Sequence, residues 1–365
     1  MASPRTTSTV KLSALRAGHL TLPEHLFITD ADPQKRSTVP SLAFLIQHGL
    51  SQTNLVFDLG IKRDLAGYAP AMSSHIAARQ PTGAGADADD DAGASLRKGG
   101  LDPAVDVDFV VLSHVHWDHV GTSGDFTAAT FLVGSGTLEV LKNGAGPRYL
   151  GELFNSNELP RDRTVEFPPV PGRANENASG GRGGSDVEDN YYERHAPKHT
   201  PTPESSNPKL PPRTSSHTTT HDGHKGEGEG EDGWVWKPLA GFSHTLDLYG
   251  DGSVYVVDSP GHIYGHVNLL VRTGEGEYVY LGGDCCHDPR ILAGEKEFAE
   301  YPDSQGGVRS VHTDTALARA TLGNIRTFAE AAIGPQGSKI QVEVVVAHDA
   351  AWAERNGGRF WPGAF

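Results

Sequence analysis

Short apolar runs separated by polar turns recur along much of the chain, and they predict strands more often than helices. Residues 10–22 alternate between apolar and polar positions, and residues 42–46 and 54–58 are compact apolar runs. Both patterns are typical of strands that are buried on one or both faces. Further apolar runs of strand length lie at 107–112, 130–133, 245–249, 254–257, 268–271, 278–281 and 340–347.

Two segments have the spacing of a helix. Residues 313–333 place Leu322 and Ile325 at helical intervals, and Gly334 with Pro335 supplies a stop signal after them. Residues 136–141 predict the start of a second helix that packs on the sheet.

Two segments interrupt this pattern because they contain few large apolar residues. Residues 81–100 include a run of aspartates, and residues 171–233 mix glycine, serine, threonine, proline and charged residues. Such chains bury too little surface to offset the entropy lost on ordering. We expect two flexible low-complexity insertions, at 81–100 and 171–233, within a single domain over residues 1–365.

The composition of the chain limits which partners and which cellular compartment are expected. The 365 residues carry a formal net charge of -15, which argues against nucleic acid as a partner. No apolar stretch approaches the length of a membrane span, and residues 1–10 lack a signal-peptide core. The two cysteines, Cys285 and Cys286, are adjacent and fit a reducing compartment. We expect a cytoplasmic protein with a small-molecule substrate, no membrane partner and an undetermined oligomeric state.

The most informative stretch follows the predicted strand 107–112. Four potential ligands, His114, His116, Asp118 and His119, fall within six residues of the loop after that strand. Neutral imidazole and carboxylate are ligands that zinc accepts. A histidine-rich surface loop is the simpler interpretation, but four ligands directly behind a buried strand favour a metal site.

Three other predicted strands end in residues of the same chemistry. His262 lies in the turn 260–266, Asp284 follows two glycines that allow close backbone approach, and His348 follows the last strand. Seven ligands on four strand ends suit two divalent ions, with Zn²⁺ as the expected metal.

At this point the chain resembles the metallo-β-lactamase-fold hydrolases. The resemblance rests on HxHxDH at 114–119, PGHxxGH at 260–266, GGD at 282–284 and the histidine at 348. It implies the α+β class, as an αββα sandwich with two mixed sheets face to face and helices outside, and a metal site at one edge. It also implies that His266 supports the site from behind, because the family's ligand is the first histidine of that turn.

The same resemblance divides the ligands between two ions. His114, His116 and His262 would hold one ion, Asp118, His119 and His348 would hold the other, and Asp284 would bridge both. A water shared by two divalent cations loses its proton near neutral pH and becomes a hydroxide nucleophile. The expected reaction is therefore hydrolysis of a carbonyl compound.

The motif SHVHWDHVG is most similar to that of the N-acyl homoserine lactonase branch, which implies a lactone substrate. Those lactonases carry tyrosine three residues after the bridging aspartate, whereas this chain has His287. Histidine there can act as an acid or hydrogen-bond donor, or it can signal another substrate. Asp118 and His287 are the candidate catalytic residues, and we expect loops near 61–80 and 287–312 to shape the pocket.

Several alternatives remain at this level. The same fold also supports thioesterases and lactam hydrolases, and a catalytically silent scaffold is a further possibility. Asp58, after the run 54–58, is either a turn former or a residue that supports the metal site. His312 is a weaker candidate for the pocket wall.

Overall fold

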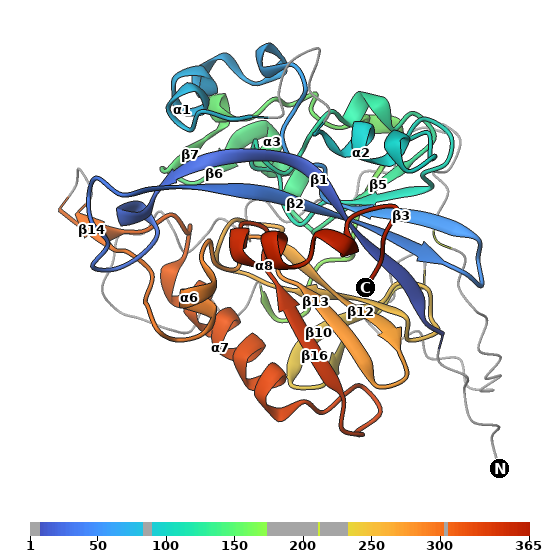
Figure 1. Cartoon of the computed structure of the whole chain (residues 1–365). Helices are drawn as coiled ribbons and strands as arrows, with labels where there is room; N and C mark the ends of the chain where they lie inside the picture. Colours follow the sequence, from blue (N-terminus) through green and yellow to red (C-terminus); the bar gives the residue numbers. More distant parts are fainter. Residues whose placement is uncertain (1–7, 83–89, 174–210, 212–232, 303–305) are drawn as a thin grey trace.

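Two six-stranded β-sheets face each other in the computed structural model, with helices on their outer sides (Figure 1). The structure describes residues 8–82, 90–173, 211, 233–302 and 306–365. The first sheet has the order β1 (Val10–Pro23), β2 (Arg36–His48), β3 (Thr53–Phe57), β4 (Phe109–Val111), β5 (Thr130–Val133) and β8 (Thr164–Glu166). The second has the order β16 (Gln341–Val345), β13 (Glu277–Leu281), β12 (Val267–Gly274), β11 (Val254–Asp258), β10 (Phe242–Asp247) and β9 (Lys237–Leu239).

Strand direction explains why distant residues meet at one edge. In the first sheet β3, β4, β5 and β8 run parallel, while β1, β2 and β3 pair antiparallel. In the second sheet β13 and β16 are parallel, and β11 has the same direction because both β11 and β13 pair antiparallel with β12. The carboxyl ends of β11, β13 and β16 therefore lie at one edge of the second sheet.

The core between the sheets follows from alternation along each strand. Leu55 and Phe57 of β3 belong to the same cluster of buried side chains as Leu269 of β12 and Leu281 of β13. Val56, between the first two, belongs instead to a second cluster that includes side chains of the outer helices. Strands buried on both faces read as continuous apolar runs, which is the pattern seen in the sequence.

Most helices cover the outer faces, as Figure 1 shows, whereas α8 (Ala350–Arg355) lies between the edges of the two sheets and adds Trp352 to the cluster between them. Helix α7 (Thr315–Ala331) begins after Asp314, whose side chain accepts a hydrogen bond from the Leu317 amide, and it buries Leu322 and Ile325. The other helices are α1 (Ser73–Ala78), α2 (Ala92–Lys98), α3 (Thr137–Asn143) and α6 (Pro289–Leu292). Two short hairpins, β6 (Gly144–Ala145) with β7 (Tyr149–Leu150) and β14 (Tyr301–Pro302) with β15 (Val308–Arg309), lie beside the sandwich.

The predicted αββα sandwich is confirmed, but the first predicted insertion is partly wrong. Residues 90–100 are ordered because Asp91 caps α2 through the Ala94 amide at 2.7 Å and also pairs with Arg63 at 2.6 Å. Leu96 of that helix is completely buried. The polar local composition, which predicted flexibility, was outweighed by these contacts.

The remaining parts of the two predicted insertions, 83–89, 174–210 and 212–232, lie outside the described residues, so their flexibility stays a prediction. Of the helices in the described ranges, none is long and apolar enough to cross a membrane.

Candidate metal centre

The loop after β4 is fixed by a buried carboxylate on the neighbouring strand. Asp58 follows β3 with a positive φ of 59°, a conformation that aspartate tolerates better than most residues. Its Oδ1 accepts the Ser113 amide at 2.7 Å, and its Oδ2 accepts the Ser113 hydroxyl at 2.7 Å and His119 Nδ1 at 2.9 Å. Asp58 therefore supports the loop, and the turn-only interpretation is wrong.

Three imidazoles and one carboxylate form what we call the first cluster. Nδ1 of His116 lies 3.0 Å from Nε2 of both His114 and His262. Oδ2 of Asp284 lies 3.7 Å from the His114 nitrogen and 3.4 Å from the His262 nitrogen. Ligands around a tetrahedral zinc, with Zn–N near 2.0–2.1 Å, are about 3.3 Å apart, so this spacing suits such an ion.

The second cluster joins Asp118, His119 and His348, whose ligand atoms lie within 4.8 Å of one another. Nε2 of His348 lies 3.6 Å from Oδ2 of Asp118, while its Nδ1 faces the Pro40 carbonyl at 2.8 Å. Hydrogen bonding at Nδ1 leaves Nε2 as the lone-pair donor. The same holds for His119, because its Nδ1 is bonded to Asp58.

Asp284 lies between the two clusters and turns one oxygen to each. Its Oδ1 is 3.2 Å from Nε2 of both His119 and His348, whereas its Oδ2 faces the first cluster. Behind it, His266 Nε2 accepts the Asp284 amide at 3.2 Å and His266 Nδ1 faces the Ser259 carbonyl at 3.1 Å. His266 thus orients Asp284, as the resemblance implied.

The electrostatics differ between the two clusters: burial favours neutral imidazoles in the first cluster, whereas neighbouring carboxylates outweigh burial in the second cluster and raise the pKa of His119 and His348. Burial lowers the pKa of His114 and His262 well below the usual value, and it lowers the pKa of His116 to about 3. Burial also opposes charge on His119, but neighbouring carboxylates, led by Asp284, outweigh it and raise the His119 pKa. Burial alone would raise the Asp284 pKa, yet the surrounding imidazoles hold it well below its usual value.

Unsatisfied atoms at the centre indicate that cations fit these residues. Within the described ranges, Nε2 of His119, Nε2 of His348 and Oδ1 of Asp284 are buried and have no hydrogen-bond partner of acceptable geometry. Buried polar atoms without a partner are costly, and a bound cation would satisfy them. The donor set, imidazole and carboxylate, is one that zinc accepts.

His287, the second candidate catalytic residue, touches the clusters. Its Nε2 lies 3.1 Å from Oδ2 of Asp284, and its ring stacks on His348 and packs against Phe27. Behind His262, His312 approaches ring nitrogen to ring nitrogen at 3.2 Å and is completely buried. His312 therefore positions His262 and does not line the pocket.

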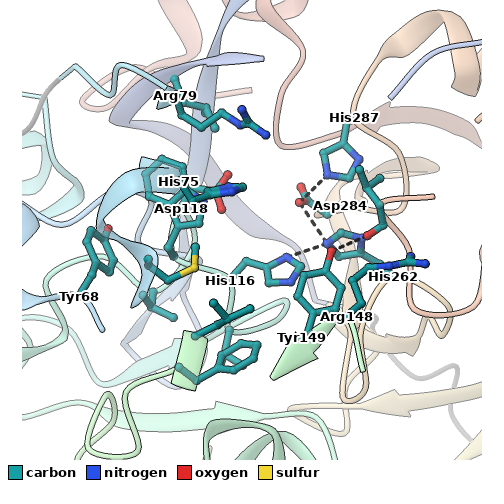
Figure 2. Close-up of a pocket in the computed structure, with 18 of the residues that line it drawn as sticks. Tyr68, His75, Arg79, His116, Asp118, Arg148, Tyr149, His262, Asp284 and His287 are labelled. Atoms are coloured by element: carbon teal, nitrogen blue, oxygen red, sulfur yellow. Dashed lines mark hydrogen bonds and ion pairs between the residues drawn. The ribbon is translucent and has the colours of Figure 1, made fainter. Parts of the chain in front are cut away.

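A cavity of about 390 Å³ opens directly in front of the clusters. His116, Asp118, His262, Asp284 and His287 line it, and Figure 2 shows Asp118 across the open space from Asp284 and His287. Side chains from residues 68–79 and 287–311 also line it, which confirms the predicted contribution of the two loops. No pattern in the sequence indicated that the segment 141–158 would line the cavity, and it contributes Arg148, Tyr149 and Phe154.

The sandwich of two sheets and the donor clusters at its edge define the structural class of this protein. The sequence profile of the Metallo-beta-lactamase superfamily matches residues 37–282, and the chain belongs to this superfamily.

Two curated relatives have related names. The chain is 28% identical over 260 residues to the metallo-hydrolase mfmC of Annulohypoxylon moriforme, covering 69% of this chain and 50% of that protein. It is 27% identical over 237 residues to a gamma-lactamase of Gibberella moniliformis, covering 64% of this chain and 70% of that protein. The chain thus spans only half the length of mfmC.

Among solved structures, a quorum-quenching N-acyl homoserine lactone lactonase superposes with a TM-score of 0.58 at 16% identity, covering 99% of this chain and 100% of that chain. At this identity the similarity establishes the fold alone.

Proposed function

We propose that this protein is a dinuclear metal-dependent hydrolase that opens a lactone, with two Zn²⁺ ions as its cofactor and a small molecule as its substrate. The observation that carries the proposal is Asp284, which turns one carboxylate oxygen to each of two donor clusters on the wall of a cavity.

Each group of neighbouring donor side chains is assigned to one ion. The first cluster would hold one ion and the second cluster the other, with Asp284 shared by both. Divalent ions, when bound, lower the pKa of water toward neutrality and stabilise negative charge that develops on an attacked carbonyl oxygen.

Side chains of the cavity would supply the remaining roles. His287 faces the cavity beside Asp284, where it can donate a hydrogen bond or a proton to the leaving oxygen of an opened ring. The hydroxyl of Tyr149 already donates to the Val311 carbonyl at 2.6 Å, which leaves His287 the better placed donor. Asp118 would act as a ligand beside the reacting carbonyl.

A second candidate is hydrolysis of a γ-lactam. It is favoured by similarity to two proteins named gamma-lactamases, each 27% identical to this chain. The lactone remains the preferred substrate for two reasons, the sequence motif at 113–121 and the pair His348 and Asp349. A thioester substrate has no comparable support among these relatives.

The test is a panel of three substrates on one zinc-loaded preparation: an N-acyl homoserine lactone, a γ-lactam and an acyl thioester. We expect lactone opening to be the fastest reaction, and we expect Asp118→Ala and His262→Ala to abolish it. Turnover of the lactam or the thioester without lactone opening would replace the proposed substrate. A stable protein that binds no metal and opens none of the three would instead be a scaffold.

A further inference from the structure

Arg79 brings a positive charge to the cavity from a rigid position. It directly follows α1, and its backbone carbonyl accepts the Thr21 amide of β1 at 2.7 Å. The side chain is half-buried and lines the cavity. Figure 2 shows its guanidinium directed over the space between Asp118 and His287. The first sheet therefore fixes the backbone from which this side chain extends into the cavity.

The other charged residues of the cavity wall already have partners. Glu158 is paired with Lys62, and Arg148 donates to the carbonyls of Ser310 and His312. Arg309 lies over the ring of Tyr301, 5.1 Å from its centroid. Asp118 and Asp284 belong to the donor clusters.

Arg79 differs from all of these, because within the described part of the chain its guanidinium has neither a carboxylate partner nor a hydrogen bond. An arginine that is half removed from water without a partner loses hydration that nothing replaces. Burial accordingly lowers the pKa of Arg79, although a guanidinium remains charged at any physiological pH.

Arg79 is available to an anion even though the whole chain is acidic, because the carboxylates near it belong to the donor clusters. The formal net charge is -15. At the cavity, the Asp118 carboxylate acts on Arg79 more strongly than any other charge, but Asp118 belongs to the second donor cluster. Arg36 acts on Arg79 with the opposite sign, and Arg309 adds a further positive charge to the cavity wall. The walls near these residues include Leu22, Phe27 and Met72. A planar guanidinium beside apolar surface suits a molecule with a carboxylate on an apolar body.

We propose that Arg79 is a specificity-determining residue that binds a carboxylate substituent of the substrate, so that the preferred substrates are lactones carrying an anionic group on an apolar part of the molecule. The identity of the reacting ring rests on the proposed function, whereas the recognition of the anion rests on Arg79.

The test compares two compounds on the zinc-loaded full chain: a homoserine lactone whose N-acyl chain ends in a carboxylate, and its methyl ester. We expect the wild type to favour the carboxylate in kcat/KM by about 10- to 100-fold, mainly through KM, as a charge-assisted bidentate contact predicts. The preference should fall to near one in Arg79→Gln and be partly restored in Arg79→Lys. Arg355→Gln is the matched control, because Arg355 is exposed on α8 outside the cavity, and it should keep the full preference.

A binding measurement separates this inference from the proposed reaction. Carbocyclic analogues of both compounds, with a ring CH₂ in place of the ester oxygen, are titrated by calorimetry into the same proteins. An Arg79-dependent preference for the carboxylate analogue, even with no lactone opened, supports the recognition of the anion while the proposed reaction fails. A preference that persists in Arg79→Gln, or a wild type without one, overturns the inference whether or not lactones are opened.

Discussion

Nδ1 of His119 lies 2.9 Å from the Asp58 carboxylate, although the two residues are 61 positions apart. This contact places the Nε2 lone pair of His119 toward the second cluster. We predict that Asp58→Asn weakens metal binding by about 10- to 100-fold, because an amide cannot hold the same ring orientation. Chelator competition measures the effect, and Asp32→Asn in an exposed turn is the control. Equal affinity in both variants would show that Asp58 has no such role.

The shared position of Asp284 predicts unequal effects of ligand removal on metal stoichiometry. His116→Ala disturbs only the first cluster and should leave about one equivalent of zinc bound. Asp284→Ala removes a donor from both clusters and should lower the content below one equivalent. Elemental analysis after dialysis gives the ratio, with two equivalents expected for the wild type. Full occupancy in Asp284→Ala would contradict the assignment of a shared ligand.

In the turn that carries His262, one added methyl group at Gly261 should lower the free energy of unfolding strongly. Gly261 has a φ of +120°, and a Cβ there would lie 2.2 Å from the Ala318 nitrogen on α7. The Asp314 and Thr313 amides bind the carbonyls of Gly261 and His262 at 2.9 Å, so the turn cannot move away freely. We expect Gly261→Ala to cost about 2 kcal/mol or more.

Thermal or denaturant unfolding of the metal-free proteins measures this cost. Gly124→Ala is the control, since a Cβ at Gly124 meets nothing within 4 Å. A similar small change in both variants would mean that the turn adapts to the side chain.

We predict that protonation of the Glu24 carboxylate lowers the stability of the fold in acid. Burial would raise its pKa, but hydrogen bonds from Ser37, Lys35 and Arg290 outweigh burial and lower the pKa from 4.5 to about 2. A carboxyl group whose folded pKa is lower than its unfolded value stabilises the fold above the unfolded pKa. This contribution is lost as the pH falls from 4.5 to about 2.

We therefore expect Glu24→Gln to be less stable than the wild type near neutral pH by about 1–3 kcal/mol. The difference should shrink in acid over the same interval. Urea unfolding of metal-free protein at several pH values measures it, with Glu295→Gln as an exposed control. A difference that is constant with pH would rule out the titration of Glu24 as its cause.

The sequence predicted the strands that carry the ligands because their signals are local. The run 130–133 matches β5 without error, and the runs before His114, Asp284 and His348 correspond to β4, β13 and β16. Each ligand follows its strand within a few residues, so the parallel directions bring them together. The sequence alone therefore predicts the seven candidate ligands, and their binding of metal stays a prediction.

Features that depend on distant contacts had no such signal. Helix α2 is ordered by the Asp91 cap and by Arg63, from a separate segment, within an acidic and glycine-rich stretch. His312 approaches His262 from 50 positions away. In the sequence Arg79 looks like an ordinary surface arginine. Its place on the cavity wall depends on the contact between its backbone and β1, far away in the chain.

Each cluster takes side chains from both halves of the sandwich. In the second cluster Asp118 and His119 come from the loop after β4 of one sheet, and His348 follows β16 of the other. A cation held there would cross-link the two layers at this edge. Retention of the ion would then report on how firmly the layers are joined, so that a defect as distant as Phe57→Ala, between the sheets, should accelerate metal release without touching a ligand.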